Sequence, residues 1–198
     1  MKNIITISRE YGSGGYEIGQ KVAEALGYKF YDKEIIAELA DKLMVSEHYI
    51  ESVDDKPVRR NIFREISPLF AEANNDTDYI FEEQGKFIAK IAEEGNCVFA
   101  GRRADFYLKD NPNALHLFFY ADTDFKVARV MESEKCTADE ALKKINDTDK
   151  RRKTSYEYTT GRKWGDRYNY DRMICTSSLG VDKCVEEIVG LIKISKGN

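Results

Sequence analysis

A glycine-rich segment near the start of the chain has the composition of a site that grips anions. It reads REYGSGGYEIG over residues 9–19, after the apolar run NIITIS at 3–8 and before a helical pattern. Glycine adopts backbone angles that other residues avoid, and a helix N-terminus offers free N–H groups and partial positive charge. An ordinary glycine turn is the alternative, but the strand-loop-helix context favours phosphate binding. We expect the contacts to come from Gly12, Ser13, Gly14, Gly15, Tyr16 and Glu17.

This loop departs from the standard phosphate-binding loop, G-x-x-x-x-G-K-[ST], at its charged position. The standard lysine reaches the outer phosphates of a nucleotide, and the hydroxyl that follows holds Mg²⁺. Here Gly15 stands in the place of the lysine, and Tyr16 and Glu17 follow where Ser or Thr is expected. Arg9 occupies the place of the first glycine. We hypothesise that Arg9 acts in catalysis by supplying part of the missing charge from the other end of the loop.

A second charged cluster, GRRAD, follows the apolar run NCVFAG at 96–101. It contains Arg102, Arg103 and Asp105. In open α/β sheets the carboxyl ends of the strands face the crevice in which ligands bind. Anion binding is therefore favoured over a surface salt bridge, because a guanidinium offers a planar fork to phosphate oxygens.

A third cluster, DTDKRR, lies in a long charged helical pattern. Asp149 precedes four consecutive cations, Lys150, Arg151, Arg152 and Lys153. The alternative interpretation is a solvated helix face with i,i+3 ion pairs. Four adjacent cations exceed what one carboxylate can pair, which favours anion binding.

Asp32 and Trp164 each admit two roles. Asp32 ends the apolar run YKFYD and is followed by a helical pattern, so it is suited either to hold a Mg²⁺-bound water or to cap that helix. Trp164, the only tryptophan, lies in GRKWGDRYNYD. It is suited to pack a hinge or to flank a base, and packing is favoured because aromatic side chains usually bury area.

Five apolar segments must position these residues. Short continuous runs suit strands that are covered on both faces, and helical patterns alternate with them. This order predicts one α/β domain over 1–198, with a five-stranded parallel sheet and helices on both faces. Two stretches exceed a minimal core, 33–92 and 137–169, and we expect both to cross the strand ends. The predicted strands are 3–8, 28–32, 96–101, 114–120 and 171–176.

With these motifs in this order, the chain resembles the cytidylate-kinase-like family, relatives of bacterial cytidylate kinases within the P-loop nucleoside monophosphate kinases. The resemblance covers nearly the whole chain. It implies a three-layer P-loop NTPase fold, a helical monophosphate-binding region at 33–92 and a lid at 137–169. It rests on ITISREYGSGGYEIGQKVAEALG, FYDKEII, NCVFAGRRADFYL, INDTDKRRKTSYEYTTGRKWGD and YDRMICTSSLG.

The resemblance also implies phosphoryl transfer from ATP, with Mg²⁺, to a nucleoside monophosphate such as CMP or dCMP. Arg102 matches the arginine that holds the monophosphate. Asp149 and Arg152 match the Asp-x-x-Arg of the lid, with Arg151 a neighbouring candidate. Asp32 matches an aspartate that ends the second strand in cytidylate kinases.

The chain departs from those kinases at several positions. Besides the lysine replaced by Gly15, Arg103 stands where an aspartate is common, with Asp105 two places later. Ala100 replaces another aspartate, and KEIIAEL replaces the substrate contacts after Asp32. Two alternatives follow: a catalytically silent nucleotide-binding module, and a kinase for a small molecule other than a nucleotide.

Composition limits the remaining function classes. The net charge of −4 argues against broad nucleic-acid binding, and no apolar run is long enough for a membrane span. Four cysteines without a C-x-x-C pair and no export signal predict a cytoplasmic protein, and two histidines make a histidine-based metal site unexpected. Segment 57–80 is suited either to an acceptor pocket or to a homodimer surface; its cations are Arg59, Arg60 and Arg64.

Overall fold

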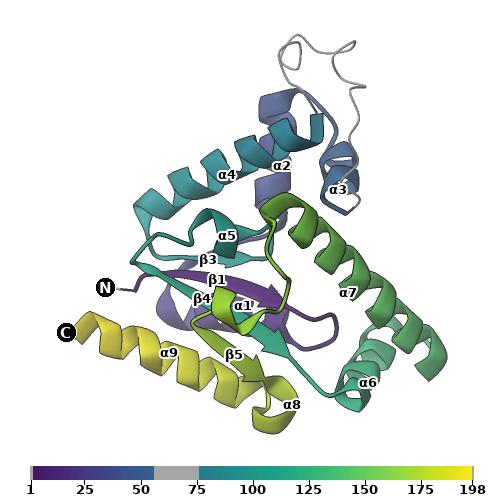
Figure 1. Ribbon diagram of the computed structural model, residues 1–198. Coiled ribbons are helices and arrows are strands. Elements are labelled where there is room, and N and C mark those ends of the chain that lie inside the picture. Colours follow the sequence, from purple (N-terminus) through teal and green to yellow (C-terminus); the bar gives the residue numbers. More distant parts are fainter. Residues whose placement is uncertain (1, 56–75, 198) are drawn as a thin grey trace.

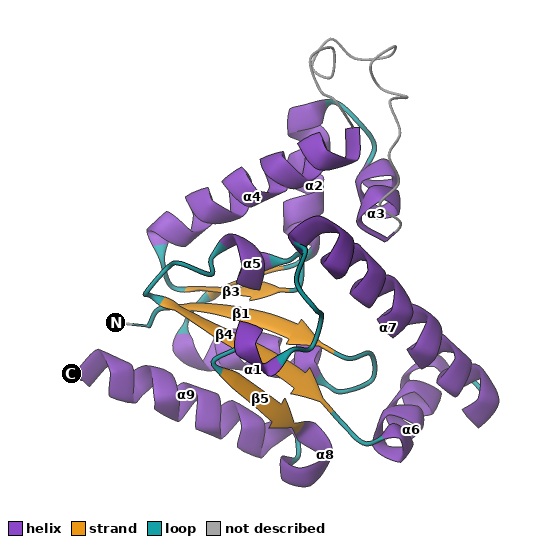
Figure 2. Ribbon diagram, viewed as in Figure 1, coloured by secondary structure: helices purple, strands orange, loops and turns teal. Residues whose placement is uncertain are grey.

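The five apolar segments form one parallel sheet in the computed structural model, which describes residues 2–55 and 76–197. The strand order is β2-β3-β1-β4-β5 (Figure 2). Each strand begins and ends within one residue of the prediction, so the predicted α/β fold is confirmed. The strands are β1 (Ile4–Arg9), β2 (Lys29–Tyr31), β3 (Cys97–Ala100), β4 (Ala114–Tyr120) and β5 (Arg172–Cys175).

Helices cover both faces of this sheet (Figure 1). Gly27 ends the first helix in the left-handed region, at φ 66°. The predicted capping box of Thr137 and Glu140 opens the long charged helix. The helices are α1 (Gly15–Leu26), α2 (Lys33–Leu43), α3 (Glu47–Asp55), α4 (Asp76–Glu94), α5 (Ala104–Tyr107), α6 (Thr123–Glu134), α7 (Ala138–Thr160), α8 (Thr176–Leu179) and α9 (Val181–Gly197), with a 3₁₀ turn, η3 (Arg167–Asn169).

The two faces of β1 explain its continuous apolar run. Ile5 and Ile7 are buried in a core cluster shared with α1 and α9, whereas Ile4 belongs to a cluster shared with α2 and α4. A fully buried isoleucine contributes about 1.5–3 kcal/mol to folding. The central strand is therefore held from both sides, and its carboxyl end is a rigid point from which a side chain can act.

The carboxyl ends of the strands face the site. β1 and β4 point toward α6 and α7, which lie beyond their ends (Figure 1). Arg9 ends β1, and Asp32 and Arg102 follow the ends of β2 and β3. Because the strands are parallel, these three residues come to one edge of the sheet.

Part of the predicted monophosphate-binding region lies outside the described residues. Arg59, Arg60 and Arg64 belong to 56–75, so the alternatives for that segment stay predictions. Among the helices that the structure describes, none combines the length and the apolar character needed to cross a bilayer.

Candidate functional site

The glycine loop between β1 and α1 is held by its own residues and by α8. Gly12 and Gly14 have φ near +80°, in the left-handed region that favours glycine. Ser13 Oγ donates to the carbonyl oxygen of Glu10 at 2.8 Å, and Thr176 Oγ1 donates to the carbonyl oxygen of Ser13 at 2.6 Å. The loop is therefore shaped before any ligand arrives.

The place of the missing lysine is filled. A Cβ atom at Gly15 would lie 2.8 Å from Cβ of Arg9 and 3.0 Å from Cβ of Phe119. Both are the roots of side chains on packed strands, so neither can swing aside. No side chain fits at position 15 without moving the sheet.

Helix α7 is fastened over the loop. The backbone N–H of Tyr11 donates to Asp149 Oδ1 at 2.7 Å, and Arg152 Nη1 donates to the carbonyl oxygen of Arg9 at 3.1 Å. The Arg152 guanidinium also lies 5.5 Å from the centre of the Tyr11 ring. Burial raises the pKa of Asp149 to about 6. Two residues of the predicted lid thus contact the loop directly.

Three arginines surround one carboxylate at the sheet edge. Arg102 Nε lies 3.3 Å from Asp32 Oδ1. Burial, together with the charges of Arg152 and Arg102, lowers the pKa of Arg9 to about 9, and Asp32 opposes this effect. Arg9 Nε is buried and has no hydrogen-bond partner among the described residues. The cluster carries more positive than negative charge, which is the electrostatic condition for binding an anion.

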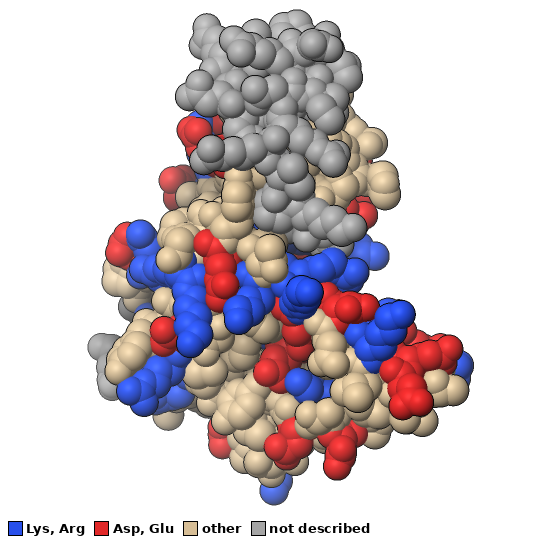
Figure 3. Space-filling view, turned by 45° about the vertical axis from the view of Figure 1, so that its right-hand side comes forward, with Lys and Arg blue, Asp and Glu red and all other residues tan. Residues whose placement is uncertain are grey.

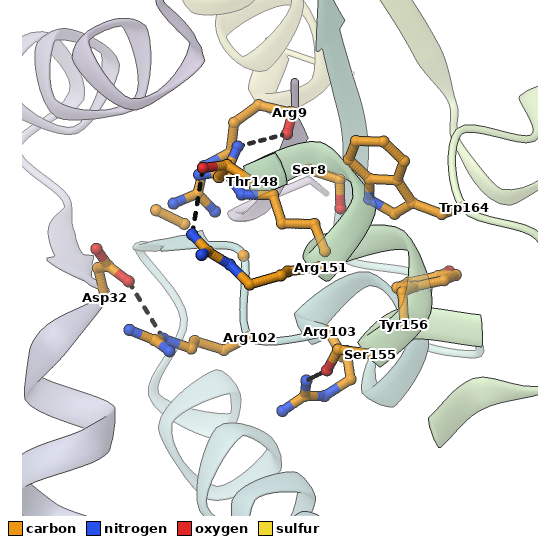
Figure 4. Close-up of a pocket in the computed structure, with 13 residues that line it drawn as sticks. Ser8, Arg9, Asp32, Arg102, Arg103, Thr148, Arg151, Ser155, Tyr156 and Trp164 are labelled. Atoms are coloured by element: carbon orange, nitrogen blue, oxygen red, sulfur yellow. Dashed lines mark hydrogen bonds and ion pairs between the residues drawn. The ribbon is translucent and has the colours of Figure 1, made fainter. Parts of the chain in front are cut away.

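Two cavities meet at this cluster. One, of about 300 Å³, lies between the strand ends and α7 (Figure 4). The other, of about 540 Å³, follows the glycine loop. Arg9, Asp32 and Arg152 line both cavities. The two cavities therefore adjoin one another at these three side chains.

The first cavity, which we call the arginine cavity, is defined by its cations. Arg9, Arg102 and Arg151 reach it from β1, the turn after β3, and α7 (Figure 4). Arg151 Nη2 also donates to Thr148 Oγ1 at 3.3 Å. Lys and Arg side chains form a band across the molecular face shown in Figure 3, although the net charge of the chain is −4.

Arg103 lies next to Arg102 in sequence, but its guanidinium is bound inside the protein. It donates from Nη1 to Ser155 Oγ at 3.0 Å and from Nη2 to Gln84 Oε1 at 2.6 Å. It also lies 4.2 Å from the centre of the Phe81 ring. These contacts join α7 to α4. Arg103 was predicted to contact the substrate, but this geometry favours a structural role.

Asp105 lies behind the wall of the arginine cavity. Ser8 Oγ donates to its Oδ1 at 3.2 Å, and the Tyr156 hydroxyl donates to its Oδ2 at 2.7 Å. Burial raises the pKa of this carboxyl. Ser8 and Tyr156 themselves line the cavity, so Asp105 orients two groups that a ligand would meet.

The contacts of Asp32 and Trp164 distinguish between the two roles predicted for each. Asp32 is the N-cap residue of α2, but its side chain makes no cap hydrogen bond. Its carboxylate faces Arg102 instead, which removes the capping alternative. Trp164 packs edge-on against Phe118, with ring centres 5.3 Å apart, and it also lines the arginine cavity.

Sequence reasoning missed two cations of the glycine-loop cavity, Lys33 and Arg129. Arg129 Nη2 bonds to Glu17 Oε2 at 2.7 Å, and this hydrogen bond lowers the pKa of Glu17. Arg129 comes from α6, more than a hundred residues away, and nothing in the sequence links it to the loop. Lys33 follows Asp32 directly, and its position at the first residue of α2 was a usable signal.

Known proteins resemble the chain along nearly its whole length. The profile of the cytidylate kinase-like family matches residues 4–178. A curated cytidylate kinase from Pyrococcus horikoshii is 27% identical over 176 residues, which cover 89% of this chain and 81% of that protein. A crystal structure of an uncharacterized protein from Eubacterium ventriosum is 30% identical, with a TM-score of 0.74 over 97% of this chain and 99% of that one.

More distant structures share the fold. The shikimate kinase from Acinetobacter baumannii is 16% identical, with a TM-score of 0.52 over 99% of this chain and 96% of that one. A gluconokinase from Sinorhizobium meliloti is 14% identical, with a TM-score of 0.51 over 100% and 97%. These likenesses confirm the predicted P-loop NTPase fold and say nothing of the acceptor.

Proposed function

Because the chain belongs to the cytidylate kinase-like family, we propose that it transfers a phosphoryl group from ATP to a nucleoside monophosphate, with CMP or dCMP as the leading acceptor. Family membership and a curated cytidylate kinase relative support a kinase-type phosphotransferase. One observation carries the proposal: two cavities share Arg9, Asp32 and Arg152. The donor phosphates would lie along the glycine loop, and the acceptor phosphate would lie in the arginine cavity.

The phosphoryl transfer needs no covalent bond between the protein and either substrate. An acceptor phosphate oxygen forms a bond to the γ-phosphorus of ATP while the bond from that phosphorus to the β–γ bridging oxygen breaks, and ADP leaves. The attacking oxygen already carries negative charge, so no general base is needed. Catalysis then depends on positioning and on positive charge around the moving group. With a pKa of about 9, Arg9 stays protonated at neutral pH and supports that role.

The residues at the loop also fit a Mg²⁺ ion. This ion is usually held by one or two carboxylates together with substrate phosphates and waters. Glu17 and Asp32 line the glycine-loop cavity and offer such oxygens, although Glu17 is bonded to Arg129 in this structure. When bound, Mg²⁺ would neutralise charge on the donor phosphates.

An assay with ATP, Mg²⁺ and a panel of nucleoside monophosphates tests the proposal. We expect turnover with at least one pyrimidine monophosphate. Arg9→Ala should lower kcat by roughly 10²–10³-fold, because it removes a charge at the reacting group. The exposed Arg172→Ala on β5 is the matched control and should leave kcat unchanged. Folded protein that turns over none of the panel would reject this function.

A silent nucleotide-binding module is the second candidate. It is favoured by the filled lysine position at Gly15 and by the bond between Tyr11 and Asp149, which holds the lid on the loop without a nucleotide. This candidate predicts a rise of the melting temperature with ATP and no product. If mass spectrometry finds a phosphorylated metabolite outside the nucleotides, the small-molecule kinase alternative is supported instead.

A further inference from the structure

We propose that Lys33, at the start of α2, is a catalytic residue. Its ammonium group would contact the outer phosphates of the donor in place of the lysine that the loop lacks. The inference rests on the proposed function and names one more residue of that same site. Lys33 is an exposed side chain that lines the glycine-loop cavity together with Gly14, Gly15 and Tyr16.

An ammonium group at the donor phosphates has to come from outside the loop. A side chain at position 15 would clash with Arg9 and Phe119, which fill the space where its Cβ would be. The loop therefore offers backbone N–H groups, but no ammonium of its own. A lysine that reaches across the cavity from another element restores the missing group without disturbing the sheet.

The other cations of the glycine-loop cavity are engaged or enclosed. Arg129 is bonded to Glu17, and Arg152 is bonded to the carbonyl oxygen of Arg9 and lies 3.7 Å from Asp149. Arg9 is half-buried, and its guanidinium lies beside Gly101, with the Nε atom fully buried. The side chain of Lys33, in contrast, makes no hydrogen bond or ion pair within the part of the chain that the structure describes. Its ammonium is available to a ligand.

Lys33 also lies at a position where a positive charge lowers the stability of the helix. It is the first residue of α2, next to the positive end of the helix dipole, where an acidic residue is preferred. The Asp32 side chain makes no cap hydrogen bond, and the acidic residue of the first turn is Glu34, whose Oε2 accepts from the backbone N–H of Asp32 at 3.0 Å. The positive end of the α2 dipole also adds to the attraction for an anion at this point.

The role is electrostatic. The ammonium donates hydrogen bonds to the β- and γ-phosphate oxygens, and its attraction for the donor strengthens as negative charge builds on the β–γ bridging oxygen. Lys33 and Arg9 thus divide the work, since Arg9 lies between the two cavities and Lys33 lines only the donor side.

The test compares Lys33→Met with Lys143→Met, which removes an equal charge from an exposed position on α7. We expect Lys33→Met to lower kcat by roughly 10²–10³-fold. Its affinity for a non-hydrolysable ATP analogue should fall more than its affinity for AMP, and Lys33→Arg should restore part of both. The melting temperature of Lys33→Met should be no lower than that of the wild type, because the change relieves the helix terminus.

Lys143→Met should match the wild type in every readout. If the wild type is active and Lys33→Met has the same kcat and the same affinity for the ATP analogue, this inference is wrong and the proposed function stands. Wild-type protein that binds no ATP overturns both.

Discussion

At the scale of single residues, two positions of the glycine loop have exchanged roles. The standard loop starts with a glycine and carries its lysine near the helix; this loop starts with Arg9 and carries Gly15 there. The structure shows that the two changes depend on each other, because Cβ of Arg9 fills part of the space above Gly15. The cation of this loop therefore stands at its strand end, where the standard loop has it at the helix end.

Substitution of Gly15 tests this interdependence. Gly15→Ala places a Cβ 2.8 Å from another Cβ, so we expect it to lower the free energy of unfolding by about 1–3 kcal/mol. Gly190→Ala on α9 is the matched control, since nothing lies within 4 Å of its added Cβ. The control should raise stability by about 0.5–1 kcal/mol, as alanine favours a helix. Urea denaturation measures both, and equal effects would contradict the steric account.

At the scale of elements, α7 joins the site at two levels. Near its middle, Asp149 and Arg152 bond to the backbone of the glycine loop. One turn later, Ser155 and Tyr156 bond to Arg103 and Asp105 inside the protein. A lid motion would have to break the first pair of contacts, and the second pair would serve as its anchor. One helix thus contacts both the glycine loop and the interior of the protein.

The contact between α7 and the loop should make stability depend on pH. Burial raises the pKa of Asp149 to about 6 in the folded state, above the value of 3.8 for a free aspartate. The folded protein therefore binds more protons than the unfolded chain between these values. The stability that this group contributes is present below about pH 4 and is lost as the pH rises through about 6.

Asp149→Asn removes that dependence and keeps an oxygen that can accept from Tyr11. Relative to the wild type, its free energy of unfolding should increase as the pH rises from 4 to 6 and then stay level. Asp147→Asn, an exposed change on the same helix, should give a flat difference. Urea denaturation of the wild type and both variants across pH 4–7 measures these differences. A difference between Asp149→Asn and the wild type that does not change with pH would refute the assignment.

At the scale of the whole molecule, a slightly acidic protein carries a band of cations across the face shown in Figure 3. Topology produces this arrangement, because the parallel strands bring their carboxyl ends, and the residues that follow them, to one edge of the sheet. The guanidinium groups around Asp32 repel one another, which lowers the stability of the unliganded protein and favours the binding of an anion.

An anion should therefore stabilise the folded protein specifically. We expect inorganic pyrophosphate, at a hundredfold excess over its Kd, to stabilise it by about 2.7 kcal/mol. That free energy corresponds to a rise in Tm of roughly 5–10 °C for a domain of this size. Sodium chloride of equal ionic strength is the control, and Arg9→Met should lose most of the effect. An equal response to both salts would show that no anion site exists there.

The sequence by itself determined the strands, most helices and the glycine loop. These depend on local properties: runs of apolar residues, helical spacing, and glycines where φ must be positive. The left-handed stop at Gly27 and the capping box at Thr137 follow from the same local chemistry. The position of Arg9 at the end of β1 was also readable, because it follows directly from the strand boundary.

Only the tertiary structure decided what the side chains at the site do. Arg102 and Arg103 are adjacent and both have φ near +56°, yet one faces Asp32 while the other bonds to Ser155 and Gln84 within the protein. Likewise, Phe119 closes the space above Gly15 from a strand about a hundred residues away. Which guanidinium meets a ligand depends on long-range packing, and local sequence patterns carry no information about partners so distant along the chain.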